Sequence, residues 1–126
     1  MANELILVVE DNEHNQKLAR DVLQVKGYRV LIAESAEAGL PLALEKKPDL
    51  VLMDIHLPGI NGIEALAKLR AAPETRAIPV LAFTASVMPQ DRSQITSAGF
   101  DGFLAKPINL KEFLDTIAGA IARGKA

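Results

Sequence analysis

The chain has 126 residues, 49% of them hydrophobic, with no cysteine and a formal net charge of −2 from 14 basic and 16 acidic residues. This composition fits one cytoplasmic domain with a sizeable core, and it excludes disulfides, thiolate metal sites and the basic surplus expected of a general nucleic-acid binder. No apolar run reaches the roughly 18 residues of a membrane span, and the N-terminus lacks the features of a signal peptide.

Short strand-like runs alternate with helical patterns along the chain. The predicted strands cover residues 4–9, 28–33, 50–53, 80–83 and 102–104. Five strand–helix units in strict alternation favour a parallel sheet with helices on both faces, that is, a three-layer α/β/α sandwich.

The first two predicted helices differ in how regular they should be. Asn12 is a suitable N-cap for a helix that carries Leu18, Val22 and Val25, and Gly27 is a suitable C-cap. Ser35 caps the second predicted helix. Pro41 falls inside it and removes one backbone hydrogen bond, and Gly39 weakens the same stretch, so we expect this helix to be kinked or to start late.

The remaining helices have clear boundary signals. Asn61 can start the third, with apolar residues at intervals of three from Ile63, and Pro89 suits the first turn of a fourth that Gly99 ends. Asn109 and Glu112 form a capping-box pattern at the start of the last helix. Its expected apolar face consists of Leu110, Phe113, Leu114, Ile117 and Ile121.

Acidic residues follow two of the apolar runs directly. Asp54 ends the run that begins at Leu50, and the pair Glu10 and Asp11 ends the first predicted strand. Since the carboxyl ends of parallel strands meet at one edge of the sheet, where open α/β folds place their chemistry, we expect these acids to lie together.

Carboxylates in close proximity repel one another unless a cation compensates them. Oxygen ligands without cysteine favour a hard divalent cation such as Mg²⁺. Lys106, after the last predicted strand, and Thr84, at the end of the fourth, could bind the oxygens of a phosphoryl group that Asp54 attacks. The sequence therefore suggests phosphoryl transfer to Asp54.

Four short motifs in this order are similar to those of response-regulator receiver domains, and the resemblance extends over the whole chain. They are residues 8–12 (VVEDN), residues 52–58 (LMDIHLP) with Gly62, residues 83–85 (FTA) and residues 105–107 (AKP). The residues of these motifs are most similar to those in receivers of hybrid histidine kinases and in stand-alone regulators of the DivK type. The resemblance implies the flavodoxin-like strand order 2-1-3-4-5.

The resemblance also implies residue roles. Asp54 would accept phosphate from a histidine kinase or a histidine phosphotransfer protein. Mg²⁺, or Mn²⁺, would be held by Glu10, Asp11, Asp54 and the backbone carbonyl of His56. Thr84 and Lys106 would bond the phosphoryl oxygens, Thr84 and Phe103 would form the conformational switch, and the Lys106–Pro107 peptide would be cis.

Three positions depart from the commonest family pattern or can tune its chemistry. Phe103 stands where many relatives have tyrosine, so it has no hydroxyl for a hydrogen bond. His56 and Ser86 lie two residues after Asp54 and Thr84, where side chains are thought to tune the lifetime of the phosphoryl group, and the sign of the His56 effect is left open.

The expected organisation is a single receiver domain over residues 1–126, with a core of about 4–122 and no output domain. Output would be docking to a downstream protein or onward phosphotransfer by a monomer or weak dimer, without nucleic acid or membrane. Three alternatives are weaker: an aspartyl-nucleophile phosphatase, a phosphorylation-independent scaffold and a flavin carrier. Asp54-Ile55-His56 lacks the second acid that the phosphatase would need, and the chain has few aromatic residues to stack on a flavin.

Overall fold

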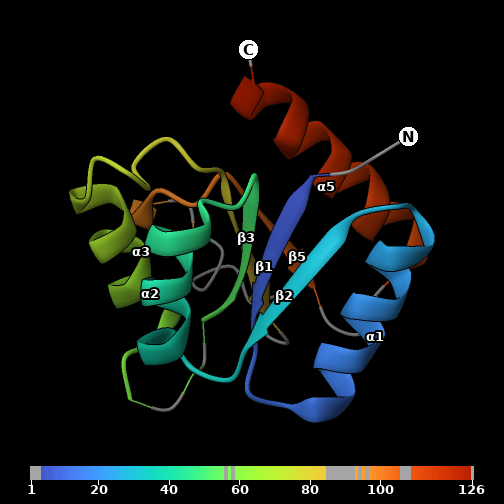
Figure 1. The fold of residues 1–126 in the computed structure, drawn as a ribbon, viewed down its shortest axis with the longest axis horizontal. Helices are drawn as coiled ribbons and strands as arrows, with labels where there is room; N and C mark the ends of the chain where they lie inside the picture. Colours follow the sequence, from blue (N-terminus) through green and yellow to red (C-terminus); the bar gives the residue numbers. More distant parts are fainter. Residues whose placement is uncertain are drawn as a thin grey trace.

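A computed structural model describes residues 4–55, 57, 59–84, 93, 95, 97–105 and 109–125. Five parallel strands form one sheet in the order β2-β1-β3-β4-β5, as expected. The strands are β1 (Leu5–Val9), β2 (Arg29–Ala33), β3 (Leu50–Asp54), β4 (Val80–Thr84) and β5 (Gly102–Ala105). The helices are α1 (Glu13–Val25), α2 (Ala36–Lys46), α3 (Gly62–Ala71) and α5 (Leu110–Lys125). Figure 1 shows α1 and α5 on one face of the sheet and α2 and α3 on the other, which confirms the three-layer fold.

Alternate residues of the central strands supply two separate apolar cores. In β1, Ile6 and Val8 pack on the α1 and α5 side, whereas Leu7 and Val9 pack on the α2 and α3 side. Helix α5 contributes Phe113 to the first of these cores, with its ring centroid 6.1 Å from that of Phe83. Burial on both faces explains why these strands read as continuous apolar runs.

The predicted helix starts are confirmed where the structure describes them. The side chains of Asn12, Ser35 and Asn61 each accept a hydrogen bond from a backbone N–H of the first turn. Asn61 also forms a full capping box with Glu64, and Asn109 accepts the N–H of Glu112. Between β4 and β5, the described residues 93, 95, 97 and 98 are helical and are followed by Gly99 with φ of 101°, while Pro89 lies outside the described residues.

The buried face of α5 differs in part from the prediction, and α1 buries residues other than those that the sequence singled out. Helix α1 buries Ala19 and Leu23, while the side chain of Val25 is 83% exposed. In α5 the predicted face is buried at Phe113, but Leu110 in the first turn is exposed. The small Ala19 lets α1 approach the sheet, and the larger apolar side chain of Leu18 next to it is left at the surface.

The expectation that α2 is kinked or starts late is wrong, because the helix is continuous from Ala36 to Lys46. Pro41 and Glu37, whose carbonyl would have bonded the missing N–H, both lie on the exposed side, where water can satisfy that carbonyl. Gly39 faces the sheet, and a Cβ placed there would lie 2.9 Å from Val9 Cγ2. Packing of this small-residue face on β1 therefore outweighs the weak helix propensity.

One arginine side chain forms hydrogen bonds to the loops at the edge of the sheet where the strands begin. Arg70 donates hydrogen bonds to the carbonyls of Arg76 and Ile78, and its Nη2 lies 2.8 Å from Asp101 Oδ2. The same Asp101 oxygen accepts the N–H of Val80. Across the described part of the chain, no helix has the length and apolar character needed to cross a membrane.

Candidate metal centre

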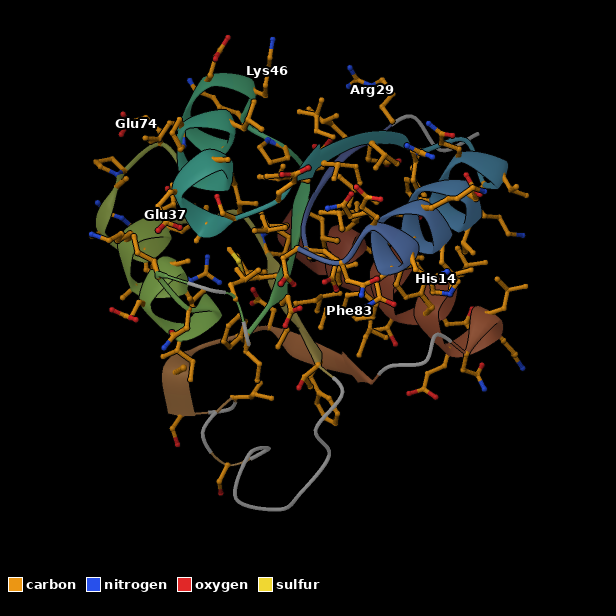
Figure 2. The ribbon with its side chains drawn as sticks, turned by 90° about the horizontal axis from the view of Figure 1, so that it is seen from below. His14, Arg29, Glu37, Lys46, Glu74 and Phe83 are labelled. Atoms are coloured by element: carbon orange, nitrogen blue, oxygen red, sulfur yellow. The ribbon has the colours of Figure 1, made fainter. Side chains whose placement is uncertain are left out.

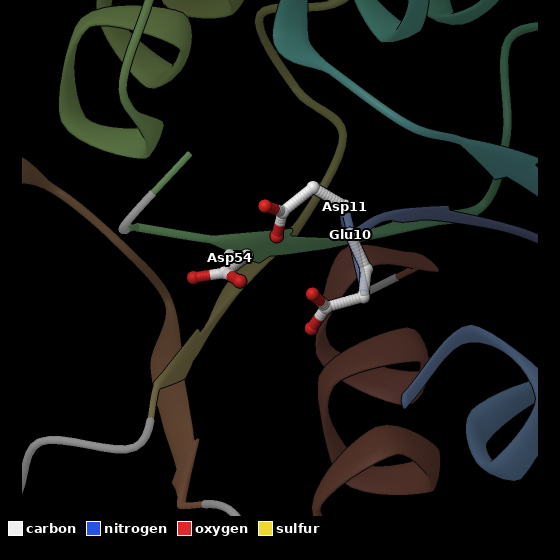
Figure 3. A group of neighbouring side chains, drawn as sticks. All are labelled: Glu10, Asp11 and Asp54. Carbon is white, nitrogen blue, oxygen red and sulfur yellow. The ribbon is translucent and has the colours of Figure 1, made fainter. Parts of the chain in front are cut away.

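Three carboxylates meet where β1 and β3 end (Figure 3). Glu10 and Asp11 directly follow β1, and Asp54 is the last residue of the neighbouring parallel strand β3. One oxygen from each carboxylate lies within 4.8 Å of the others. The structure therefore brings together the three acids that the sequence placed at one edge of the sheet.

Strand alternation explains why Glu10 and Asp54 approach each other. Glu10 continues the series of Ile6 and Val8, and Asp54 continues the corresponding series on β3, so both side chains leave the sheet on its α1 and α5 side. Because β1 and β3 are hydrogen-bonded neighbours, these two acids are brought together by the sheet itself.

Two of the three acids are buried. Glu10 and Asp54 are 0% and 3% exposed, respectively, whereas Asp11 is exposed. Buried carboxylates are costly in a protein interior unless hydrogen bonds or a cation compensate them. This burial is the electrostatic reason to expect a positive charge at the site.

Backbone and side-chain hydrogen bonds fix Glu10. Its Oε2 accepts the N–H of Asn12 at 3.0 Å, and its own N–H donates to the carbonyl of Ala33 at 2.9 Å. The side-chain amide of Gln16, in the first part of α1, donates to the Glu10 carbonyl at 2.6 Å. The turn from β1 into α1 thus holds Glu10 in a defined position, and Gln16 is a contributor that the sequence did not reveal.

The three acids fit a small divalent cation. Mg²⁺ takes oxygen ligands at about 2.1 Å, so two direct ligands of one ion lie at most about 4.2 Å apart. The 4.8 Å spread is slightly larger, which a rotation of the exposed Asp11 side chain or a water between one carboxylate and the ion would accommodate. The all-oxygen donor set suits Mg²⁺ or Mn²⁺ and does not suit a soft metal.

Thr84 ends β4 beside the acidic group, and its side chain is fully buried. Asp54 is paired with Phe83 across β3 and β4, which places Thr84 one residue further along the adjacent strand. Thr84 is itself paired with Ala105, the residue that precedes Lys106 in the sequence. The strand register thus places Thr84 at the same edge of the sheet as Asp54, one residue beyond the strand partner of Asp54.

Gly62 allows the first turn of α3 to lie directly on the end of β3. A Cβ on Gly62 would be 2.6 Å from both the carbonyl oxygen of Asp54 and the Cα of Ile55. The Gly62 N–H also donates to the Ile55 carbonyl at 3.3 Å. In the sequence, Gly62 stood out only as part of a family motif. The structure shows the steric reason why this position is a glycine.

The other expected site residues are only partly described. Phe103 is partly buried and packs against the core on the α2 and α3 side. His56, Ser86, Lys106 and the Lys106–Pro107 peptide lie outside the described residues. Their roles therefore stay predictions.

Comparisons with known proteins agree with this arrangement. Residues 6–118 match the family described as the response regulator receiver domain. The chain is 42% identical over 112 residues to the polar-differentiation response regulator DivK of Brucella ovis, an alignment that covers 89% of this chain and 91% of DivK. DivK of Brucella anthropi is 41% identical over an alignment of the same length that covers the same fractions of the two chains.

Solved structures give the same result. The receiver domain of a sensor histidine kinase from Pseudomonas aeruginosa PAO1, with a magnesium ion coordinated in its active-site cleft, has a TM-score of 0.89 and 33% identity over 96% of this chain and 99% of that one. A response regulator from Chloroflexus aurantiacus, described as putative, has a TM-score of 0.92 and 29% identity over the same shares. Neither the fold nor these comparisons favour the phosphatase, scaffold or flavin-carrier alternatives. The chain belongs to the response regulator receiver domain family, the signalling proteins of two-component systems.

Proposed function

We propose that Asp54 is the phosphoacceptor of this receiver and that Glu10 and Asp11 hold the divalent cation that phosphorylation requires. The observation that carries the proposal is the meeting of three carboxylates at the ends of β1 and β3, two of them buried, with their oxygens within 4.8 Å. A cation at this point would relieve the repulsion between the acids and leave Asp54 at the edge of the sheet to react.

The proposed reaction is a phosphoryl transfer from a phosphohistidine. An Asp54 carboxylate oxygen forms a bond to phosphorus while the bond between phosphorus and the imidazole nitrogen breaks, and the imidazole keeps the electron pair. The bound cation would neutralise charge on the phosphoryl oxygens. The Thr84 hydroxyl and the Lys106 ammonium are proposed to bond those oxygens as well, and the product is an acyl phosphate on Asp54.

The proposed partners are a histidine kinase or a histidine phosphotransfer protein as donor, and a protein target that reads the phosphorylated state. The near full-length alignment with DivK supports a stand-alone regulator that works by docking or onward phosphotransfer rather than by turnover of a substrate. Thr84 and Phe103 are the proposed switch. Thr84 borders the acidic group, and Phe103 lies on β5 two residues before Ala105, which pairs with Thr84. Phosphorylation would shift an existing equilibrium between two surfaces.

Intact-mass measurement tests the proposal directly. The wild type is incubated with acetyl phosphate with and without Mg²⁺, and we expect the mass of one phosphoryl group to be added only when Mg²⁺ is present. Asp54→Asn should add none, while Asp115→Asn, which removes an exposed acid on α5, should behave like the wild type. A phosphoryl group on Asp54→Asn, or none on the wild type with any donor, would overturn the proposal.

A further inference from the structure

The loop that joins β3 to α3 is contacted at its apex by a side chain from α2. Gly59 has φ of 73°, and the N–H of the next residue, Ile60, donates to Glu37 Oε2 at 3.5 Å. A Cβ on Gly59 would lie 2.5 Å from the same oxygen, so the carboxylate is packed closely on the loop backbone. Figure 2 shows Glu37 between α2 and α3.

The two ends of this loop are held by other means. At the start, the side chains of Ile55 and Leu57 are buried in the core on the α2 and α3 side. At the end, Gly62 donates to the Ile55 carbonyl, and Asn61 forms the capping box of α3. The contact of Glu37 therefore adds an anchor at the apex, and this anchor comes from another part of the chain.

Helix α2 is well placed to serve as that anchor because its first turns are fixed to β1. Ser35 caps the helix by accepting the N–H of Ala38 at 3.1 Å. Two residues after Glu37, Gly39 lets the helix backbone approach Val9, with a Cβ at this position only 2.9 Å from Val9 Cγ2. Val9 is the residue before Glu10. The part of α2 that carries Glu37 is thus packed through Gly39 on the end of β1, directly before the acidic pair.

We infer that Glu37 is a positioning residue for the phosphoacceptor loop, holding the segment after Asp54 in register with the end of β1. This inference rests on the proposed function, because the loop matters through the cation site formed by Asp54 with Glu10 and Asp11. The same loop contains position 56, whose backbone carbonyl is proposed as a further cation ligand. A loop held at its apex keeps these ligands arranged before the cation arrives, which lowers the cost of binding it.

A simpler role for Glu37 is that of an acid in the first turn of α2, where negative charge interacts favourably with the helix dipole. The two roles are separated by two substitutions. Glu37→Ala removes both the charge and the hydrogen-bond acceptor, whereas Glu37→Gln removes the charge and keeps an acceptor oxygen of the same reach. Positioning through the Ile60 N–H predicts that glutamine rescues, and a dipole effect predicts that it does not.

The experiment uses the full chain and measures two quantities by NMR, the exchange rate of the Ile60 amide hydrogen and the Kd for Mg²⁺. In Glu37→Ala we expect Ile60 exchange and the Kd for Mg²⁺ each to rise by about threefold, the fold-change of a modest net hydrogen bond. Glu37→Gln should stay close to the wild type in both. The matched control is Glu45→Ala, since Glu45 is an exposed acid in the last turns of α2 that pairs only loosely with Lys46 at 3.7 Å.

Two results would overturn the positioning role: wild-type Ile60 exchange and Mg²⁺ affinity in Glu37→Ala, or a glutamine variant as impaired as the alanine one. Failure of the proposed function looks different. A wild type that binds no Mg²⁺ at millimolar concentration overturns the cation site itself, whereas normal wild-type binding that Glu37→Ala leaves unchanged overturns only the role of Glu37.

Discussion

Replacing Gly62 by alanine should directly disturb β3, the strand that ends in Asp54. The added Cβ would lie 2.6 Å from the Asp54 carbonyl oxygen and 2.6 Å from the Ile55 Cα, closer than real Cβ contacts essentially ever come. Both atoms belong to backbone, so neither can rotate away. Carbon atoms pack at about 3.5 to 4.0 Å, so the first turn of α3 must move by about 1 Å from the end of β3.

The size of the effect follows from this displacement. Overpacking of a well-packed region costs about 1 to 3 kcal/mol. Alanine is intrinsically the better helix former by up to about 1 kcal/mol, but less of that gain applies at the first helical position, so the net loss should be about 2 kcal/mol. For a domain of this size such a loss lowers Tm by about 6 to 10 °C. The shift also moves Asp54 relative to Glu10 and Asp11, so the affinity for Mg²⁺ should fall as well.

Thermal unfolding and Mg²⁺ titration of the same samples test the reasoning. Gly102→Ala is the matched control, because its Cβ would meet only the flexible end of a side chain, Leu81 Cδ2 at 3.2 Å, at the opposite edge of the sheet. We expect this variant to be only slightly destabilised and to bind Mg²⁺ like the wild type. A Gly62→Ala protein with wild-type Tm would refute the close approach, and one with lowered Tm but unchanged Mg²⁺ affinity would refute the link to the site.

Three further outcomes are expected. Asp11→Asn should weaken Mg²⁺ binding at least about tenfold, since it removes one of the three proposed charged ligands, while Asp115→Asn should not weaken it. Equal Mg²⁺ affinities of the two variants by calorimetry would contradict the proposed role of Asp11. Arg70→Lys should lower the free energy of unfolding by about 1 to 2 kcal/mol in urea titrations, because a lysine cannot make the three hydrogen bonds that the guanidinium makes. A variant as stable as the wild type would contradict the role of Arg70 in connecting these loops. His56→Asn should change the half-life of the phosphorylated protein in either direction, as followed by the decay of the phosphorylated mass, and an unchanged half-life would rule out tuning by His56.

The sequence was a good guide to the fold where several local signals agreed. The β1 and β3 runs are buried on both faces and bounded by polar residues, so they read clearly as strands of a parallel sheet. The caps Asn12, Ser35 and Asn61 act through hydrogen bonds to residues three positions away, so their effect is visible in the sequence.

The wrong expectations concern contacts between distant segments. The sequence singled out Leu18, Val22 and Val25 on the first helix, but the sheet is met mainly by Ala19 and Leu23, and this depends on how closely the helix can approach. The expected defect in α2 was likewise inferred from local propensity alone. Contact of its small residues with β1 determines the outcome, and that contact is made only in the folded chain.

The candidate site divides in the same way. Glu10, Asp11, Asp54 and Thr84 were predictable because parallel strands bring their carboxyl ends to one edge, whatever the details of packing. The supporting contacts of Gln16 and Glu37 were not predictable, since a polar residue in the first turns of a helix is ordinary in any sequence. Their partners became apparent only once the loops were placed in space.

The central claim is that Asp54 carries the phosphoryl group, and the most direct measurement is to locate that group on the chain. The protein is phosphorylated with acetyl phosphate and Mg²⁺, reduced with borohydride, which converts an aspartyl phosphate to homoserine, and digested for tandem mass spectrometry. We expect homoserine at position 54 and an unmodified Asp11. Homoserine at Asp11 or elsewhere, or a phosphorylated protein in which Asp54 is unchanged, would contradict it.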